Sequence, residues 1–434
     1  MGHLEELKSK IANHTAHAGV LGLGYVGLPL AVELAKVGFQ VTGIDVSQEK
    51  VDAINRGESY VLDVPTSELK PLVESGKLRA TTDFSVIGDL DTANICVPTP
   101  LRKTKDPDMS FVVACTEQIA NYLTPGTLII LESTTYPGTT EELLLPALEK
   151  SGLKVGEDFF LCFSPERVDP GNEKYQTRNI PKVVGGVTAG CTEVGALFYQ
   201  QALETVVPVS STSVAEMVKL LENTFRMINI GLVNELAMMC DRMGINVWEV
   251  IDAAATKPFG FMPFYPGPGL GGHCIPIDPF YLSWKTKQAG VEARFIELAG
   301  YINGQMPRFV VDKVAEALNG QAKPVKGSHV HLLGVAYKRD IDDLRESPAL
   351  DIAHLLQQRG AKVTFSDPYI SNADHDGFHI ESLNEDEALA TADCVVIVTD
   401  HRNVDYAKVA SKAKLIVDSR NAMKGHSGDH IVRL

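Results

Sequence analysis

The chain has 434 residues, of which 44% are hydrophobic and 22% charged, and its formal net charge at pH 7 is -15. This composition is ordinary for a globular protein with two or three domains. Because a general nucleic-acid binder needs a basic face, the acidic balance argues against nucleic acid as a partner. No apolar run reaches the roughly 18 residues of a membrane-spanning helix, so we expect no membrane partner.

The cysteines indicate reduced thiols in a cytoplasmic protein. They are odd in number, widely spaced and without a Cys-x-x-Cys pair, which disfavours both a disulfide framework and a structural zinc site. The twelve histidines also lack metal-ligand spacing, so we expect no metal. The seven cysteines are Cys96, Cys115, Cys162, Cys191, Cys240, Cys274 and Cys394. Residues 1–17 lack the apolar core of a signal peptide and read as a short helical lead-in.

The first motif is a glycine turn at residues 22–27, between a predicted strand and a predicted helix. Gly22, Gly24 and Gly27 fit the dinucleotide pattern, and the helix would begin near Leu28. Free N–H groups at a helix N-terminus attract a pyrophosphate. The alternative is a glycine turn in some other α/β protein.

The next predicted strand, residues 39–44, ends at Asp45, about 20 residues after the turn. A carboxylate there can accept hydrogen bonds from a ribose diol and would repel a 2′-phosphate. The pattern therefore favours NAD over NADP.

Three further apolar runs predict buried strands at residues 93–97, 127–131 and 159–163. Each is followed by a polar or Pro-rich loop, and ligands bind beyond the carboxyl ends of such strands. In the last of these loops Glu166 could be a general base for water, or a surface carboxylate paired with Arg167.

A long helix is predicted from Ser213 to Met243, with Gly244 as its stop. Ser213-Val-Ala-Glu216 has the form of a capping box. Apolar residues occur on several sides, which predicts a buried helix that could also present an apolar face to a second subunit. Lys219 and Asn223 share one face, where they could polarise a reacting oxygen or form an ordinary solvated stripe.

The segment from Gly269 to Pro279 places Cys274 in a glycine-rich bend with Asp278 four residues on. Glycines allow close approach of a substrate, and a thiol displayed there can be a covalent nucleophile. A free cysteine is otherwise a small buried hydrophobe. Asp278 could be an acid/base group or the cap of the next helix.

A second α/β unit begins near Lys326, with predicted strands at 329–333, 362–365, 394–398 and 415–417 and a helix at 348–359. Lys338 and Arg345 near its first turn could bind a diphosphate or be solvated charges. We therefore predict an α/β protein with two Rossmann-like doubly wound domains, joined by a long central helix and a helical dimerisation region. The expected domains are residues 1–212 (NAD-binding), 213–322 (central helical, with the cysteine loop) and 323–434 (the second α/β domain).

The ordered set of motifs resembles the UDP-glucose/GDP-mannose dehydrogenase family from about Ala18 onward. The motifs are GLGYVGLPLA (22–31), VPTP (97–100), ESTTYPGTT (132–140), SPERVDPG (164–171), VKLLENTFR (218–226), GPGLGGHCIPIDPFYL (267–282) and GVAYKRDIDDLRESPA (334–349). Within the family, ESTTYPG, SPERVDPG and GGHCIPIDPFYL most resemble the branch that oxidises UDP-N-acetylglucosamine at C6.

The resemblance implies a four-electron oxidation of a sugar C6 alcohol to a carboxylate with two NAD+. It assigns Cys274 to attack on the C6 aldehyde, giving a thiohemiacetal that is oxidised to a thioester. Lys219 and Asn223 would stabilise the oxyanion, and Asp278 would position water or take a proton. The resemblance makes Glu166 the base for thioester hydrolysis and places Thr134 where water is ordered.

The resemblance also implies binding residues. Those for NAD are Gly22, Gly24, Tyr25, Val26, Gly27, Asp45, Pro98, Thr99, Thr134 and Arg345. Those for the UDP-sugar are Glu166, Arg167, Val168, Lys219, Asn223, Lys257, Gly271 and Lys338, with Lys257 matching only loosely. In the family the long helix forms the dimer core and the C-terminal domain holds the uridine diphosphate. We therefore expect a homodimer or a higher homo-oligomer.

The sequence leaves alternatives open. The substrate could be UDP-N-acetylmannosamine or UDP-glucose. A two-electron hydroxyacid dehydrogenase would share the cofactor domain but not the second α/β unit or the cysteine bend. A nucleotide-sugar sensor without catalysis would bind the same ligands.

Overall fold

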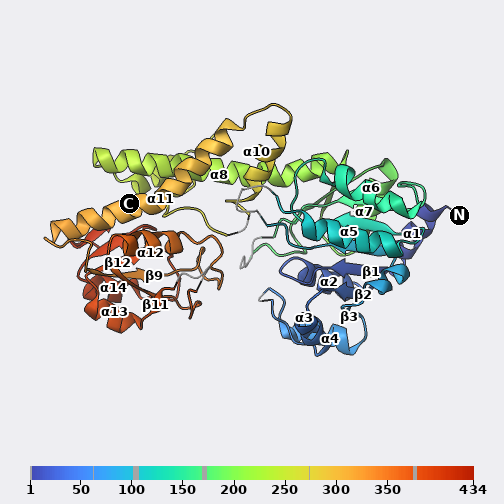
Figure 1. Cartoon of the computed structure of the whole chain (residues 1–434), viewed down its shortest axis with the longest axis horizontal. Coiled ribbons are helices and arrows are strands. Elements are labelled where there is room, and N and C mark those ends of the chain that lie inside the picture. The colour runs from blue at the N-terminus through green and yellow to red at the C-terminus, as the bar shows by residue number, and fades with distance from the viewer. Residues whose placement is uncertain (1, 62, 101–106, 169–173, 273, 375–378) are drawn as a thin grey trace. The chain divides into compact units, whose positions relative to one another are not determined.

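The computed structural model describes residues 2–61, 63–100, 107–168, 174–272, 274–374 and 379–434 (Figure 1). His273, beside the candidate nucleophile, lies outside these residues. The chain forms two compact units: Met1–Glu222 with Trp284–Ala289, and Asn223–Ser283 with Gly290–Leu434. The long helix α8 (Thr212–Met243) begins in the first unit and continues in the second. The predicted domain boundaries at 212/213 and 322/323 stay predictions.

The first unit is built on an eight-stranded sheet in the order β3-β2-β1-β4-β5-β6-β7-β8. Neighbours are parallel except β6 and β7, which are antiparallel. The strands are β1 (His17–Leu21), β2 (Gln40–Ile44), β3 (Leu78–Thr81), β4 (Thr92–Ile95), β5 (Leu128–Leu131), β6 (Phe160–Phe163), β7 (Lys182–Gly186) and β8 (Val206–Val209). The order of the first six is that of a doubly wound dinucleotide fold.

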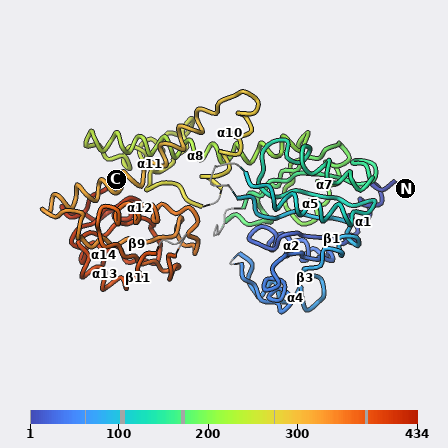
Figure 2. The backbone as a smooth tube through the Cα atoms, viewed as in Figure 1, coloured from blue at the N-terminus to red at the C-terminus, as the bar shows by residue number. Residues whose placement is uncertain are grey.

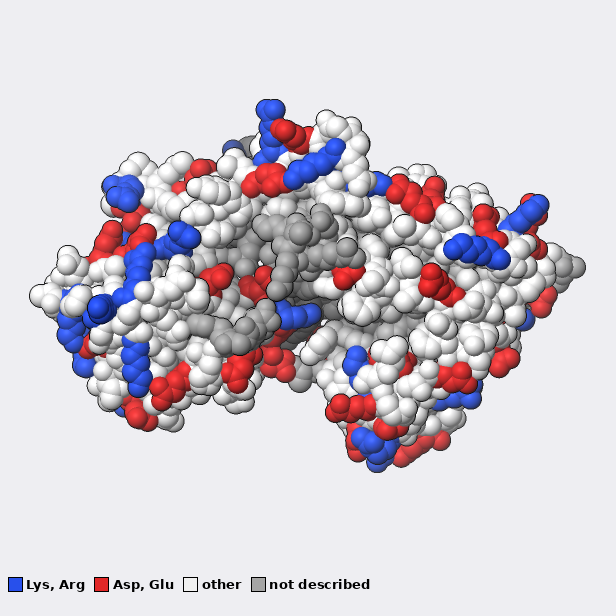
Figure 3. Space-filling model, viewed as in Figure 1, with Lys and Arg blue, Asp and Glu red and all other residues white. Residues whose placement is uncertain are grey.

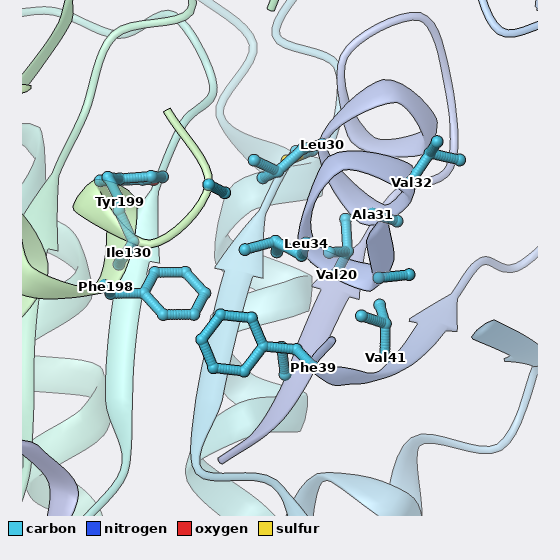
Figure 4. Packing of buried hydrophobic residues seen from close by; sticks show 14 of the residues in the cluster. Val20, Leu30, Ala31, Val32, Leu34, Phe39, Val41, Ile130, Phe198 and Tyr199 are labelled. Atoms are coloured by element: carbon cyan, nitrogen blue, oxygen red, sulfur yellow. The ribbon is translucent and has the colours of Figure 1, made fainter. Parts of the chain in front are cut away.

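Helices cover both faces of this sheet because successive strand residues point to opposite sides. Val20 belongs to the core under α2 and α7, while Leu21 belongs to the core under α5. In the first core the ring centres of Phe39 and Phe198 lie 5.7 Å apart, and Leu34 lies beside them (Figure 4). The helices are α1 (His3–Ala12), α2 (Gly27–Lys36), α3 (Gln48–Asn55), α4 (Thr66–Glu74), α5 (Ser110–Tyr122), α6 (Leu145–Leu148) and α7 (Ala189–Gln200), with short turns η1 (Phe84–Asp89), η2 (Thr140–Leu144) and η3 (Glu149–Ser151).

The second unit contains a six-stranded sheet in the order β11-β10-β9-β12-β13-β14, with parallel neighbours throughout. Its path can be followed from orange to red in Figure 2. The strands are β9 (His329–Leu333), β10 (Lys362–Ser366), β11 (Glu381–Ser382), β12 (Cys394–Ile397), β13 (Ile416–Asp418) and β14 (Ile431–Arg433). The helices are α9 (Val247–Ala255), α11 (Arg294–Gly320), α12 (Pro348–Gln358), α13 (Glu385–Thr391) and α14 (Tyr406–Lys412). Helix α10 (Asp278–Gln288) begins in this unit and ends in the first. The predicted fold class, with two Rossmann-like units and a long helix between them in the chain, is confirmed.

The start of α8 differs from the prediction. The helix begins at Thr212, and the Ser211 hydroxyl accepts the Val214 N–H at 3.2 Å. Glu216 therefore lies beyond the first turn and closes no capping box. Its fully buried carboxylate instead accepts the N–H groups of Gly138 at 2.6 Å and Thr140 at 2.9 Å. The helix ends before Gly244, whose φ of 67° marks the predicted stop.

The prediction that α8 is buried all round is wrong for the single chain. Leu220, Met227 and Ala237 face the core, but Leu221 is 60% exposed and Met243 is 61% exposed. The exposed stripe comprises Met217, Leu221, Phe225, Leu232, Leu236, Met239 and Met243. The reason is geometric: each unit covers only one side of its own part of this 32-residue helix.

Candidate functional site

The glycine turn of the first unit has the shape that a dinucleotide requires. Gly22 has a φ of 92°, and a Cβ on it would lie 2.8 Å from the Cys96 carbonyl oxygen. A Cβ on Gly27 would lie 1.8 Å from the Gly22 carbonyl oxygen, whereas a Cβ on Gly24 would meet nothing within 4 Å. The outer glycines thus permit tight packing, and Gly24 leaves room for a pyrophosphate at the start of α2.

Asp45 ends β2 beside this turn. Its Oδ2 accepts the Leu23 N–H at 2.8 Å and its Oδ1 accepts the Ser47 N–H at 2.9 Å. Lys50 Nζ lies 3.5 Å from Oδ2. The carboxylate is held by the turn, and its remaining lone pairs suit a ribose diol. These residues fit NAD.

The other candidate cofactor residues are placed less uniformly. Tyr25 is exposed at the turn and Val26 precedes α2. Thr99 is buried in the loop after β4, next to Pro98, and Thr134 is half-buried after β5. Arg345 belongs to the second unit, where its guanidinium forms an ion pair with Asp343 at 2.6 Å.

Glu166 does not pair with the Arg167 guanidinium. Its Oε1 accepts the N–H groups of Arg167 and Val168, each at 2.7 Å, and its Oε2 receives Lys182 Nζ at 3.2 Å. The Arg167 side chain instead donates to Glu222 at 2.6 Å. Burial alone would raise the pKa of Glu166, but Lys182, the Val168 N–H and Lys219 together lower it. Glu166 is therefore an anion at neutral pH.

Lys219 is 8% exposed on α8 and forms no hydrogen bond or ion pair with the other described residues. Its Nζ is not among the fully buried, unpartnered polar atoms of the described residues, so the ammonium can meet solvent or an anionic or strongly polarised ligand atom. Its charge acts on Glu166 within the first unit.

The candidate nucleophile belongs to the second unit. All seven cysteines lie among the described residues; six are buried, and Cys274 is the partly exposed one. Burial raises the pKa of Cys115 and Cys394 to about 12, which makes these thiols poor nucleophiles.

Asn223 and Asp278 are brought together in the same unit as Cys274. Asn223 Nδ2 donates to Asp278 Oδ2 at 2.5 Å, and Arg226 donates to the Asn223 carbonyl oxygen. The carbonyl of Cys274 accepts the Asp278 N–H at 2.9 Å, so the cysteine precedes the first turn of α10. Asp278 thus both begins the helix and contacts Asn223, and Arg226 was not singled out from the sequence.

The glycines before Cys274 allow the bend to pack against the segment after β9. The Gly272 N–H donates to the Arg345 carbonyl at 2.9 Å, with a φ of 79°. A Cβ on Gly271 would lie 2.5 Å from the Tyr337 Cβ. A larger residue at Gly271 would push the cysteine bend away from this support.

A hollow of about 550 Å³ lies beyond the carboxyl ends of the second sheet, and none of its lining residues was singled out from the sequence. The lining includes four basic residues, Arg339, Arg402, Arg420 and Lys424. It also includes Asp252 and Asp400, which pair with Lys424 and Arg339. The Arg420 Nε donates to the Val398 carbonyl at 2.9 Å, and its guanidinium forms no ion pair with an acidic side chain among the described residues. Burial, and then Arg339, lower the pKa of Arg420 to about 10. The arrangement suits an anionic ligand such as a diphosphate.

Two predicted substrate residues do not line this hollow. Lys257 is exposed, with its Nζ 5.0 Å from the centre of the Phe259 ring. Lys338 is half-buried in the segment after β9. Both stay predictions.

Within the described ranges, no group of three His, Cys, Asp or Glu side chains could hold a metal ion. On the face seen in Figure 3, basic and acidic side chains are interspersed. No helix in the described part of the chain is both long enough and apolar enough to cross a membrane.

A dinucleotide-type glycine turn, a second parallel-sheet unit and one accessible thiol define a nucleotide-dependent oxidoreductase. Models of the UDP-glucose/GDP-mannose dehydrogenase family match three stretches of the chain: the NAD-binding domain at residues 16–203, the central domain at 213–305 and the UDP-binding domain at 331–425. The chain belongs to this family, and it is an NAD-dependent nucleotide-sugar dehydrogenase.

Similar proteins agree on this class. A UDP-N-acetyl-D-glucosamine 6-dehydrogenase of Pseudomonas aeruginosa is 39% identical over 82% of this chain and 83% of its own length. An NDP-N-acetyl-D-galactosaminuronic acid dehydrogenase of Ralstonia nicotianae is 37% identical over 92% and 95%. The solved structure of a UDP-D-ManNAc dehydrogenase from Pyrococcus horikoshii matches with a TM-score of 0.88 and 33% identity, over 96% of this chain and 98% of that one.

Proposed function

We propose that this protein oxidises the C6 hydroxyl of UDP-N-acetylglucosamine to the carboxylate, with two NAD+ and a covalent intermediate on Cys274. The observation that carries the proposal is the contrast among the thiols: six are buried, and Cys274 is accessible in a glycine-rich bend. The same unit holds the Asn223–Asp278 pair.

Binding uses the charged groups of both units. Asp45 would accept hydrogen bonds from the ribose hydroxyls of NAD, and the pyrophosphate would lie over Gly24 at the start of α2. In the second unit Arg420 and its neighbours would take the diphosphate of the sugar nucleotide, and we keep Lys338 as a further cation for it.

The first oxidation removes a proton from the C6 hydroxyl and a hydride from C6, leaving an aldehyde. NAD+ supplies the hydride acceptor for this step and for the later one. Lys219 and Asn223, one turn apart on α8, would stabilise negative charge on the oxygen as the proton leaves.

The Cys274 sulfur then bonds to C6 as the C=O double bond of the aldehyde opens, and the thiol proton passes to the C6 oxygen, which gives the thiohemiacetal. Attachment restores a tetrahedral carbon that bears a hydrogen, which is a better hydride donor than an aldehyde. Loss of that hydride and of the hydroxyl proton gives a thioester to Cys274.

Hydrolysis completes the reaction: a water oxygen bonds to C6, the C–S bond breaks, and the thiol regains a proton. Glu166 would act as base towards this water, which Thr134 and Asp278 would help to orient. Its charged state at neutral pH suits that role.

UDP-N-acetylglucosamine is our first choice because the motifs around Glu166 and Cys274 resemble that branch, and because the Pseudomonas relative carries that activity in its name. UDP-N-acetylmannosamine is the second choice, favoured by the names of other relatives and by the Pyrococcus structure. An N-acetylgalactosamine nucleotide would fit the Ralstonia relative.

The test is to count NADH at completion with excess NAD+ and limiting sugar nucleotide. We expect two NADH per UDP-N-acetylglucosamine and little from UDP-N-acetylmannosamine or UDP-glucose. One NADH per sugar would reject the thioester route, and two from another sugar would keep the mechanism but replace the substrate. Binding of the sugar nucleotide by the folded protein without NADH would indicate a sensor.

The exposed apolar stripe on α8 and the free thiols support two further parts of the proposal: a homodimer or higher homo-oligomer, and a cytoplasmic location. Leu232→Glu on the stripe should reduce the mass measured by sedimentation. Val113→Glu on α5 is the control, and an unchanged mass in Leu232→Glu would place the interface elsewhere.

A further inference from the structure

The reversed strand β7 of the first sheet brings a lysine to the edge where the candidate base lies. In a parallel sheet the first residue of a strand lies at the edge opposite the ligand. Because β7 runs against β6, with Phe163 opposite Gly185, its first residue, Lys182, lies across from Glu166 at the carboxyl edge. The lysine is 5% exposed.

Lys182 is held from its other side by Glu132, the residue directly after β5. Its Nζ lies 2.6 Å from Glu132 Oε2 and 3.2 Å from Glu166 Oε2. Glu132 Oε1 in turn accepts hydrogen bonds from Asn94 and the Tyr199 hydroxyl, each at 2.7 Å. The ammonium therefore has a fixed position between two carboxylates.

Both oxygens of Glu166 are thereby occupied by donors. Oε1 takes two backbone N–H groups and Oε2 takes Lys182, so the plane of the carboxylate is determined. If all three side chains are ionised, the group of Glu132, Lys182 and Glu166 has a net charge of -1. A buried ion pair is stable only when additional hydrogen bonds satisfy its charged groups. This group has such hydrogen bonds, so it can hold the Glu166 carboxylate in a fixed position, unlike an ion pair on the surface.

The charge of Lys182 is stable around neutral pH. Burial alone would lower the pKa of Lys182, but Glu132 and Glu166 raise it above its ordinary value. The lysine therefore stays protonated and cannot serve as a general base itself.

We propose that Lys182, anchored by Glu132, is a positioning residue for Glu166: it orients the carboxylate and maintains its negative charge for attack by water on the thioester. The inference rests on the proposed function of Glu166 as the base for hydrolysis. A purely structural role, tying β5 to β7, is the competing explanation.

The experiment compares the full-length Lys182→Met protein with wild type by two measurements. The first is the pKa of Glu166 without substrate, from the infrared carboxylate band that Glu166→Gln removes. The second is the pH profile of thioester decay in a single turnover with NAD+ and the sugar nucleotide. We expect the pKa of Glu166 and the acid limb of the profile to rise together by about one unit or more in Lys182→Met.

Lys182→Arg should restore both values towards wild type, because it returns the charge. Lys10→Met is the matched control: Lys10 pairs with Asp91 at 2.9 Å, just before β4 and thus at the opposite edge of the same sheet. It should leave both values unchanged.

The outcomes separate the inference from the proposed function. An unchanged Glu166 pKa in folded Lys182→Met overturns the positioning role. A raised pKa with an unaltered decay profile supports the positioning role and overturns Glu166 as the base. If Lys182→Met does not fold, the double variant Lys182→Met/Glu132→Gln removes the ion pair without leaving Glu132 charged, and the same two measurements decide.

Discussion

The two sheets open with the same turn, yet only one turn is built for a dinucleotide. Each first strand ends at a glycine with positive φ, 92° at Gly22 and 80° at Gly334. In each, an aspartate at the end of the next strand accepts N–H groups of that turn: Leu23 N–H to Asp45 at 2.8 Å, and Val335 N–H to Asp367 at 2.7 Å.

The two turns differ in how the aspartate is covered and in the segment after the glycine. The Asp367 side chain is 0% exposed and receives His401 Nε2 at 3.0 Å, whereas the Asp45 side chain is 7% exposed. A helix begins at Gly27, but after Gly334 the next helix begins only at Pro348. One turn therefore combines a carboxylate that keeps a small exposed fraction with a helix N-terminus, and the other uses its aspartate for stability and leaves room for a charged segment.

The largest expected effect tests whether binding and chemistry are separable. If Cys274 takes part in the chemistry but not in binding, Cys274→Ser should keep the affinity of the protein for NAD+ and for UDP. The rate of acid formation should fall by roughly 10³-fold or more. Calorimetry and stopped-flow absorbance at 340 nm measure the two quantities. Full turnover to the acid would remove the covalent mechanism, and Cys240→Ser, on a buried thiol, is the control.

The next effect separates the two turns. Gly27→Ala should weaken NAD+ binding more than about tenfold, because the new Cβ meets the Gly22 carbonyl and displaces the helix start. Gly334→Ala should instead destabilise the second unit by about 1–3 kcal/mol, since its Cβ would lie 2.3 Å from the Thr399 carbonyl. Calorimetric titration with NAD+ and denaturant unfolding measure these effects. If both variants lost NAD+ affinity equally, the conclusion that only the first turn binds the dinucleotide would be wrong.

The two aspartates should respond in opposite ways. Asp367→Asn should lower the free energy of unfolding by about 3 kcal/mol, because an amide cannot accept from all the donors around it. Asp45→Asn should cost about 1 kcal/mol of stability but weaken NAD+ roughly tenfold. Urea unfolding and NAD+ titration of both variants give the four values, and similar stability losses would contradict the distinction.

The smallest effect is the pH dependence of the Asp367 contribution. Burial would raise the pKa of Asp367, but His401 and the backbone N–H groups lower it overall. A carboxyl whose pKa is lower in the folded state stabilises fully above its unfolded value of about 3.9, and this stabilisation is lost as pH falls through the folded pKa. The difference in unfolding free energy between wild type and Asp367→Asn should therefore shrink below about pH 4. A constant difference from pH 7 to pH 3 would contradict this.

Local patterns were enough to predict much of the fold. The glycine turn at Gly22, the strand ending at Asp45 and the stop at Gly244 follow from periodicity and backbone preference over a few residues. The antiparallel strand β7 was not predicted. For that reason the pairing of Lys182 with Glu132 and Glu166, which lie 50 and 16 residues away in the sequence, was also missed. Such contacts depend on sheet order, which no short window contains.

The failures on α8 have the same origin. Glu216 fits a capping box by spacing, but the loop at Gly138 competes for its carboxylate. The hydrophobicity of the helix was evident, although which side each unit covers depends on packing between distant segments. At the candidate site, Cys274 and Asp278 were predicted from one motif, whereas Arg420 was missed because a single arginine after a strand has no local signal.

Because Cys274 is the partly exposed thiol, it can be titrated apart from the other six. A mild alkylating reagent should react once per chain at neutral pH, since the other six thiols are buried. The stoichiometry of labelling would then count functional chains in any preparation, and a sugar nucleotide that slows labelling would reveal occupancy without turnover. The same contrast makes this thiol the natural anchor for a covalent inhibitor.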